Sequence, residues 1–202
     1  MAQKPSTLRE RRAQLTRDEI LRAARRLFAE RGYASTSVRE IAQAAGVSAQ
    51  TVYDSVGSKQ EVVARLNDLI DAEAGIGGIV RAAAESGDPR EAVAAPARVV
   101  RSIIENCGDI VRAVVTGAAA EPELAAVLAE GHRRHVQGAR RIVGLLQRLD
   151  GLDPSVEPDQ AAETLAVLSD ATFALMLRDD YGWSPERIET WITEMSRTLL
   201  LR

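Results

Sequence analysis

Residues 36–61 read TSVREIAQAAGVSAQTVYDSVGSKQE, and the pattern in this stretch decides the fold. Three serines, Ser37, Ser48 and Ser58, each stand directly before a run of helix-forming residues. A serine side chain in that position accepts a hydrogen bond from a free amide of the first turn, so it marks a helix start. Gly46 can take the left-handed backbone that ends a helix, and it leaves a connection too short for an antiparallel hairpin. Two helices joined this tightly cross steeply, which is the helix-turn-helix arrangement.

The residues before this stretch predict one further helix. Thr16–Glu19 has the form of a capping box, an apolar face runs from Ile20 to Phe28 at helical spacing, and Gly32 is placed to end the helix. Residues 1–15 have no apolar stripe and carry three arginines, so we expect a flexible basic arm there. These arginines are Arg9, Arg11 and Arg12. The helix-turn-helix domain is therefore predicted to span residues 16–60.

The rest of the chain, residues 61–202, keeps the helical period, and no strand pattern interrupts it. Capping residues and prolines predict helices after Ser58, over 89–106, 109–115, 122–149 and 158–178, and from Ser184 onward, with a break or bend at Gly75–Gly78. The chain is therefore predicted to be all-α with about nine helices. A three-helix N-terminal domain precedes a C-terminal helical domain.

Charge is divided unevenly between these two parts. Residues 1–60 hold eleven Lys and Arg against six Asp and Glu, a net charge of +5, whereas residues 61–202 hold fifteen against twenty-three, a net charge of −8. A basic segment beside an acidic one indicates that only the first part is suited to a polyanionic partner. Small basic segments are also common on ordinary surfaces, so the charge alone does not decide the function.

Several classes of protein are excluded by what the sequence lacks. The single cysteine, Cys107, cannot form an intrachain disulfide or a paired-cysteine zinc site. The N-terminus has no apolar signal core, and no apolar run reaches the roughly 20 residues of a membrane span, so we expect a cytoplasmic protein. No nucleophile elbow, zinc-protease motif or phosphate loop is present. We therefore expect no enzyme, no metal and no cofactor.

The predicted helix that follows Ser48 has one apolar and one polar face. Ala49, Val52 and Val56 share the face that would turn toward the neighbouring helices. The opposite face carries short polar side chains: Gln50, Thr51, Asp54 and Ser55. Such a helix fits a DNA major groove, where amide, hydroxyl and carboxylate groups reach base edges. Each of these residues taken alone is better explained as an ordinary surface residue.

A family resemblance supports the interpretation as a DNA-binding helix. The segments LFAERGY at 27–33, TSVREIA at 36–42, AGVS at 45–48, TVY at 51–53 and SKQE at 58–61 together resemble the DNA-binding domain of the tetracycline-repressor (TetR) family. The resemblance covers about residues 16–65. It implies a compact helical DNA-binding domain followed by a divergent helical domain, at residues 61–202, that dimerises and usually binds a small effector.

Carried over by motif, the resemblance assigns roles to single residues. Arg39, Gln50 and Thr51 are implied to face DNA bases, and Thr36, Tyr53 and Lys59 to contact phosphate, with Ser48, Asp54 and Ser55 completing the predicted DNA-binding set. Two positions depart from the commoner pattern: Val56 stands where many members have Phe, and Asp54 stands where an aromatic residue or His is frequent. A carboxylate at position 54 repels phosphate unless it accepts a hydrogen bond from a cytosine amino group.

The C-terminal domain offers weaker signals for an effector site. The candidates are polar or aromatic residues on predicted apolar helix faces: Cys107, His132, His135, Asp170 and Phe173. Each has an ordinary structural alternative, such as a core histidine, a packed cysteine or a surface ion pair. Gaps beside the many glycines of this domain would suit a small, mainly apolar effector, or equally close helix packing.

The last two predicted helices are apolar enough to require a partner. Six residues form the predicted dimer interface: Leu175, Ile188, Trp191, Ile192, Met195 and Leu199. A monomer would expose them as a large apolar patch, so we expect a homodimer.

The sequence thus predicts a repressor that leaves a palindromic double-stranded operator when it binds a small effector. The alternatives are a helical ligand-binding or interaction protein that does not bind DNA, and a regulator without a small-molecule effector.

Overall fold

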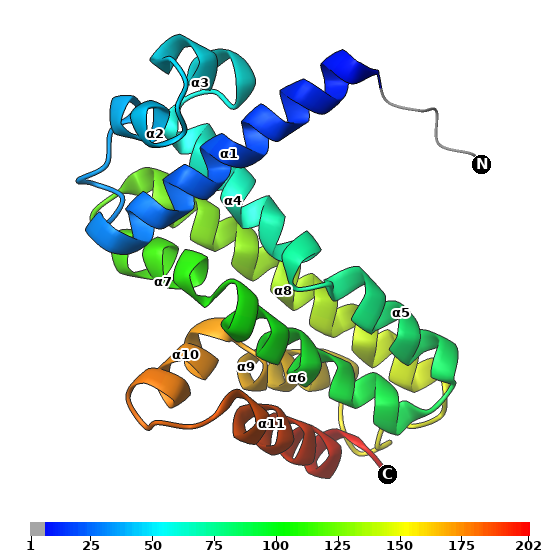
Figure 1. Ribbon diagram of the computed structural model, residues 1–202. Coiled ribbons are helices and arrows are strands. Elements are labelled where there is room, and N and C mark those ends of the chain that lie inside the picture. Colours follow the sequence, from blue (N-terminus) through cyan, green and yellow to red (C-terminus); the bar gives the residue numbers. More distant parts are fainter. Residues whose placement is uncertain (1–6) are drawn as a thin grey trace.

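The computed structural model describes residues 7–202, and these residues form eleven helices without a β-sheet (Figure 1). The helices are α1 (Leu8–Arg31), α2 (Val38–Ala44), α3 (Ala49–Ser55), α4 (Lys59–Glu73), α5 (Ile76–Ser86), α6 (Pro89–Asn106), α7 (Gly108–Gly117), α8 (Pro122–Arg148), α9 (Pro158–Leu168), α10 (Ala171–Asp179) and α11 (Pro185–Leu200). The described part of the chain is all-α, as predicted, and α1–α4 lie at one end of the molecule in Figure 1.

Serine and threonine caps start the helices of this end. Ser37 and Ser58 each form a complete capping box with the glutamate three residues later, and the Ser48 hydroxyl accepts from the Thr51 amide. Each cap satisfies an amide that would otherwise lack a partner in the first turn. The three helix starts predicted between residues 37 and 58 are therefore confirmed.

The core of this end continues into the rest of the molecule. Ile20, Ile41 and Val52 are fully buried in a cluster that also contains Ile110 of α7 and Leu124 of α8. The apolar core therefore crosses the domain boundary that the sequence predicted at residue 60. α1 and α4 therefore pack directly against α7 and α8.

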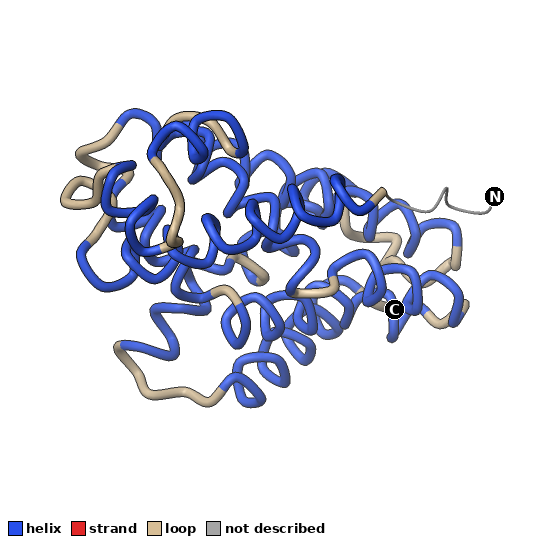
Figure 2. Tube along the Cα trace, turned by 45° about the horizontal axis from the view of Figure 1, so that its top comes forward, coloured by secondary structure: helices blue, strands red, loops and turns tan. Residues whose placement is uncertain are grey.

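The remaining helices pack around α6. Two further apolar clusters hold them together, one between α5, α6, α8 and α9 and one between α6, α10 and α11. Short loops join most of the helices (Figure 2). Among residues 7–202, none of the helices combines the length and the apolar character needed to cross a membrane.

The predicted start of the first helix at Thr16 is wrong. α1 begins at Leu8, because Thr7 and Glu10 form a capping box of their own, and the Thr16 hydroxyl donates to the Arg12 carbonyl inside the helix. Residues 8–15 are therefore helical and not a flexible arm. The first six residues of that predicted arm lie outside the described residues.

Two other regions differ from the predicted helix plan. The bend at Gly75 is present, with the left-handed φ of 62°, but a separate helix, α5, follows it directly. The helix predicted over 158–178 is interrupted at Ser169 and Asp170. The Asp170 carboxylate accepts from the amides of Thr172 and Phe173 at 2.8 and 3.0 Å, so it starts a new helix in place of a continuous one.

Candidate nucleic-acid interface

The turn between α2 and α3 fixes the position of α3. Gly46 has a φ of 68°, and the Val47 amide donates to the Ala42 carbonyl at 3.0 Å. This left-handed glycine and its hydrogen bond end α2, and the Ser48 cap begins α3 two residues later. α3 is therefore held at a defined angle by a short, hydrogen-bonded turn.

The two faces of α3 differ as the sequence predicted. Val52 is fully buried and Val56, just after the helix, is also buried. Gln50, Tyr53 and Asp54 point to solvent, and the Tyr53 side chain is 52% exposed. Since the apolar face is anchored in the core, the polar face is presented on a fixed support, as a base-reading helix requires. Ser55, the last residue of α3, is half-buried.

Hydrogen bonds order the side chains of this polar face. The Gln50 Nε2 donates to the Asp54 Oδ1 at 2.8 Å, and the Ser48 and Thr51 hydroxyls lie 2.8 Å apart. An ionised carboxylate only accepts, so it must face the amide nitrogen of Gln50. The Gln50 carbonyl oxygen and its second N–H therefore remain for another partner.

Two basic residues flank α3 in different ways. Arg39 lies on α2 and is exposed. The Lys59 ammonium instead lies 3.9 Å from the centre of the Tyr33 ring, a cation–π contact at the start of α4. Burial lowers the pKa of Lys59, and the nearby carboxylates of Glu121, Glu123 and Glu40 only partly oppose this effect. Contact of Lys59 with phosphate requires the ammonium to leave the ring.

Thr36 does not have the phosphate-contacting geometry that the resemblance implied. Its side chain is buried, and its hydroxyl donates to the Gly32 carbonyl at 2.9 Å. Its amide donates to the Tyr33 carbonyl at 3.1 Å. Both donors are used inside the protein, so Thr36 stabilises the loop between α1 and α2.

The five predicted effector residues do not line one pocket. Cys107 is buried in the cluster shared with α1 and α4, whereas Asp170 caps α10. His132 is exposed, and the His135 Nε2 lies 2.8 Å from the Ala166 carbonyl. Phe173 packs against Trp191 with ring centres 6.0 Å apart. Sequence periodicity placed these residues on helix faces but carried no information about which faces meet.

A small apolar cavity lies where α1, α4, α7 and α8 meet. It has a volume of about 10 Å³, and its lining includes Phe28, Leu66, Val114 and Leu124. This volume holds roughly one water molecule, so a larger ligand requires the surrounding helices to move apart.

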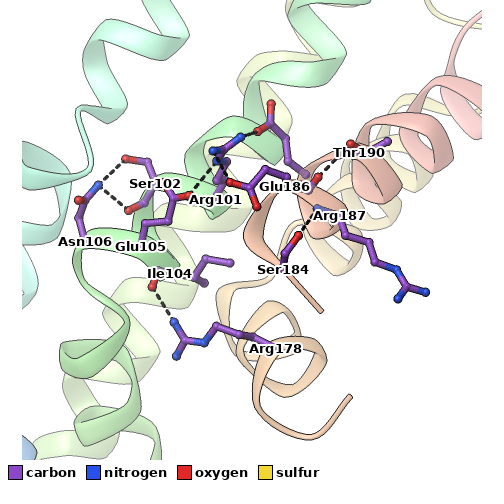
Figure 3. Close-up of polar contacts among 11 residues, drawn as sticks. Arg101, Ser102, Ile104, Glu105, Asn106, Arg178, Ser184, Glu186, Arg187 and Thr190 are labelled. Carbon is purple, nitrogen blue, oxygen red and sulfur yellow. Dashed lines mark hydrogen bonds and ion pairs between the residues drawn. The ribbon is translucent and has the colours of Figure 1, made fainter. Parts of the chain in front are cut away.

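The predicted dimer residues divide into two groups. Leu175, Ile188 and Ile192 are buried within their own chain, in the cluster between α6, α10 and α11, and are therefore core residues. Trp191 and Met195 are half-buried, and Leu199 is 49% exposed. Polar contacts also fix α11 against α6: Arg101 pairs with Glu186 at 2.7 Å (Figure 3). Leu175, Ile188 and Ile192 were mistaken for interface residues because α10 and α11 turn their most apolar sides toward α6 of the same chain.

An arginine that the sequence did not single out joins the two parts of the molecule. Arg25 of α1 forms ion pairs of 2.6 Å with Glu73, the last residue of α4, and with Asp109 of α7, and it also donates to the Asn106 carbonyl. Hydrogen bonding to Asp109 raises the pKa of Arg25 despite its partial burial. Burial alone would raise the pKa of Asp109, but the hydrogen bond and charge of Arg25 hold it below its ordinary value.

Cys107 lies beside this ion-pair cluster. Burial, together with the charge of Glu73, raises the pKa of the Cys107 thiol to about 11. The thiol is therefore protonated at neutral pH and a poor nucleophile. Among the described residues, no group of His, Cys, Asp and Glu could hold a metal ion.

Comparison with known proteins agrees with this geometry. The family model described as "Bacterial regulatory proteins, tetR family" matches residues 20–66. The HTH-type transcriptional repressor KstR2 of Mycolicibacterium smegmatis is 41% identical over 56 residues, which are 27% of each chain. The matches to curated relatives span 27–36% of those proteins' own length.

Two solved structures resemble nearly the whole fold. NalD, described as the secondary repressor of the MexAB-OprM multidrug efflux pump in Pseudomonas aeruginosa, has a TM-score of 0.71 at 22% identity, covering 95% of this chain and 98% of NalD. SmeT, described as the repressor of the Stenotrophomonas maltophilia multidrug efflux pump SmeDEF and solved as a complex with triclosan, has a TM-score of 0.76 at 19% identity, covering 94% of this chain and 93% of SmeT. Residues 20–66, which contain α2, α3 and the turn between them, are thus the segment that matches the tetR family of bacterial regulatory proteins.

Proposed function

We propose that this protein is a transcriptional repressor that recognises operator DNA through α3. The observation that carries the proposal is the fixed polar face of α3, which follows a tight turn inside the segment that matches the TetR family. Gln50 and Thr51 on α3 and Arg39 on α2 supply amide, hydroxyl and guanidinium groups for base edges. Tyr53 supplies a phosphate contact at the margin of α3, and Lys59 supplies another once its ammonium leaves the Tyr33 ring.

The proposal includes a homodimer. Among the described residues, four exposed large apolar side chains lie on or next to α9–α11: Val167, Met176, Tyr181 and Leu199. A second copy packed against α9–α11 would cover some of these side chains by an isologous contact. Two-fold symmetry then places two α3 helices in successive major grooves, about 34 Å apart, so the operator is expected to be roughly palindromic. Light scattering at micromolar concentration should give twice the chain mass of 21.8 kDa.

A small, mainly apolar effector completes the proposal. The triclosan complex of SmeT supports this chemistry by analogy, and the cavity between α1, α4, α7 and α8 offers an apolar site for it. A ligand that widens this cavity displaces α4, which leads directly back to α3. A tenfold loss of operator affinity requires only about 1.4 kcal/mol of preference for the displaced state.

Selection from a library of randomised DNA duplexes tests the DNA-binding proposal. Repeated rounds of binding by the full chain should enrich an inverted repeat with half-sites about one helical turn apart. Absence of any enriched sequence, with a folded protein, would contradict the proposal and favour a helical ligand-binding protein.

The effector is tested separately on the enriched duplex. A panel of apolar small molecules that includes triclosan is screened by thermal shift, and each hit is then added to an operator titration. Hits should weaken operator binding. Tight binding without any change in operator affinity, across the panel, would contradict the effector-release mechanism but leave DNA binding intact.

A further inference from the structure

The first two turns of α1 lie outside the packed body of the protein. Every residue from Leu8 to Leu15 is exposed, and the first buried residue of the helix is Ile20. We call Leu8–Leu15 the α1 spur. At the usual helical rise it is roughly 12 Å long, the length of about three to four base pairs. Figure 1 shows it projecting beyond the neighbouring helices.

The α1 spur is basic. It carries Arg9, Arg11 and Arg12 against the single carboxylate of Glu10. The Glu10 carboxylate accepts from the Thr7 amide at 2.7 Å, so it is occupied as part of the helix cap. Arg9 and Arg12 are three residues apart and share one side of the helix, where like charges repel.

The helical conformation of the α1 spur requires stabilising interactions. The spur continues a helix that is anchored in the core from Ile20 onward, but repulsion between its arginines makes these first two turns less favourable. The capping box at Thr7 compensates at one end, and the Gln14 side chain donates to Asp18 at 2.8 Å further along. A polyanion beside the α1 spur would convert the repulsion between its arginines into attraction.

The position of the α1 spur relative to α3 indicates that the polyanion is DNA. In Figure 1 the spur and α3 reach the same end of the molecule, opposite the end formed by α9–α11. A DNA duplex that contacts α3 therefore lies at the level of the spur. We propose that the α1 spur binds the DNA sugar-phosphate backbone next to the base pairs that α3 reads. This inference rests on the proposed function, which supplies the duplex.

A second copy of the chain is the competing partner for this surface. Leu8 and Leu15 are 66% and 59% exposed, and they are seven positions apart, so they lie on one side of the spur. Two α1 spurs packed together would bring their arginines close to each other, which opposes such a contact. Charge complementarity therefore favours DNA.

The test compares two pairs of arginines of equal charge. Arg9→Ala/Arg12→Ala removes two charges from the spur, and Arg140→Ala/Arg141→Ala removes two exposed charges from α8. Fluorescence anisotropy with a labelled duplex of random sequence gives the affinity at several salt concentrations. The slope of log affinity against log salt should become shallower by about 1.8 for the spur variant, and much less for the α8 variant. Arg9→Lys/Arg12→Lys should keep the wild-type slope.

The outcomes separate this inference from the proposed function. If the wild-type protein binds no duplex, the proposed function fails. If it binds but both double alanine variants have the same slope, only the role of the spur fails. A halved mass of Leu8→Ala/Leu15→Ala in light scattering would assign the spur to a second copy and would also overturn the inference. Unchanged helicity by circular dichroism, expected because Arg9 and Arg12 are exposed, shows that each variant is folded.

Discussion

At the scale of single residues, we expect Gln50 and Asp54 to decide what α3 can recognise. Because Asp54 holds one N–H of the Gln50 amide, the carbonyl oxygen and the other N–H are left together. An acceptor beside a donor matches the N6 amino group and N7 of adenine in the major groove. The sequence suggested that Asp54 would repel phosphate. We propose instead that Asp54 positions the Gln50 side chain.

We expect Gln50→Ala to remove a preference for adenine at one position in each half-site. The loss in affinity for the preferred duplex should be about 1–3 kcal/mol, with little change on a duplex that lacks that adenine. Asp54→Asn should relax the same preference because an asparagine can face either end of the Gln50 amide. Titration of duplexes that contain 7-deazaadenine at that position measures the effect directly. Equal losses on both duplexes for Gln50→Ala would contradict base reading by this residue.

Arg25 is the residue whose removal should cost most stability outside the apolar core. Its side chain is only 25% exposed and holds Glu73 and Asp109 together. Arg25→Ala should lower the free energy of unfolding by about 1–3 kcal/mol, since it leaves the part-buried Asp109 carboxylate without its cation and close to the exposed Glu73 carboxylate. Arg112→Ala, which breaks a more exposed pair with Asp179, should cost less than about 1 kcal/mol. Urea unfolding at pH 7 compares the two, and similar losses would contradict the central role of Arg25.

The pH dependence of stability tests the same cluster from the acid side. The pKa of Asp109 is lower in the folded protein than its ordinary value, so its contribution to stability is present above that value. As the pH falls below about 4, the unfolded chain takes up the proton first and stability declines. The decline should be less steep in Asp109→Asn, measured by urea unfolding between pH 3 and 7. Identical pH profiles for the two proteins would show that Asp109 is not stabilised by Arg25.

At the scale of the elements, the helix starts could be predicted where a cap residue stands at a unique place. Ser37, Ser48, Ser58 and Ser184 all precede the helices predicted from them. The start of α1 was misplaced because Thr7–Glu10 and Thr16–Glu19 both have the capping-box pattern, and local sequence does not choose between them.

Interruptions within apolar stretches were harder to predict. Asp170 sits inside a helical pattern, and only its hydrogen bonds to the amides that follow show that it begins a helix. Likewise, the apolar faces of α10 and α11 were visible in the sequence, but their packing against α6 depends on residues about 80 positions away. The exposed polar face of α3 was predictable because it depends on local sequence, whereas the surroundings of the candidate effector residues depend on long-range packing.

The turn between α2 and α3 gives a prediction at this scale. Gly46→Ala meets no neighbouring atom, yet the left-handed backbone at this position is unfavourable for alanine. The free energy of unfolding should fall by about 1 kcal/mol. Gly138→Ala, inside α8 and equally open to a new methyl group, should instead raise stability by about 0.5–1 kcal/mol. Urea unfolding of both variants checks the contrast, and a loss of stability in both would show that space, not backbone conformation, decides.

At the scale of the whole molecule, α4 connects the DNA-binding end to the rest. Arg25 of α1 holds its last residue, Glu73, and Arg134 of α8 pairs with Asp68 at 2.8 Å and with Asp71 at 3.5 Å. The carboxylates of α4 are thus held by two arginines from different helices. We propose that an effector that moves α7 or α8 strains these pairs and thereby links its binding to the position of α3.

The ratio of affinities for an enriched operator and for a scrambled duplex of equal length tests the central claim that α3 reads DNA sequence. Fluorescence anisotropy at physiological salt should give a ratio of at least about 10³ for the wild-type protein. The ratio should fall at least tenfold when Gln50 and Thr51 are both replaced by alanine, while affinity for the scrambled duplex changes little because the phosphate contacts remain. An unchanged ratio in this folded double variant would contradict the account.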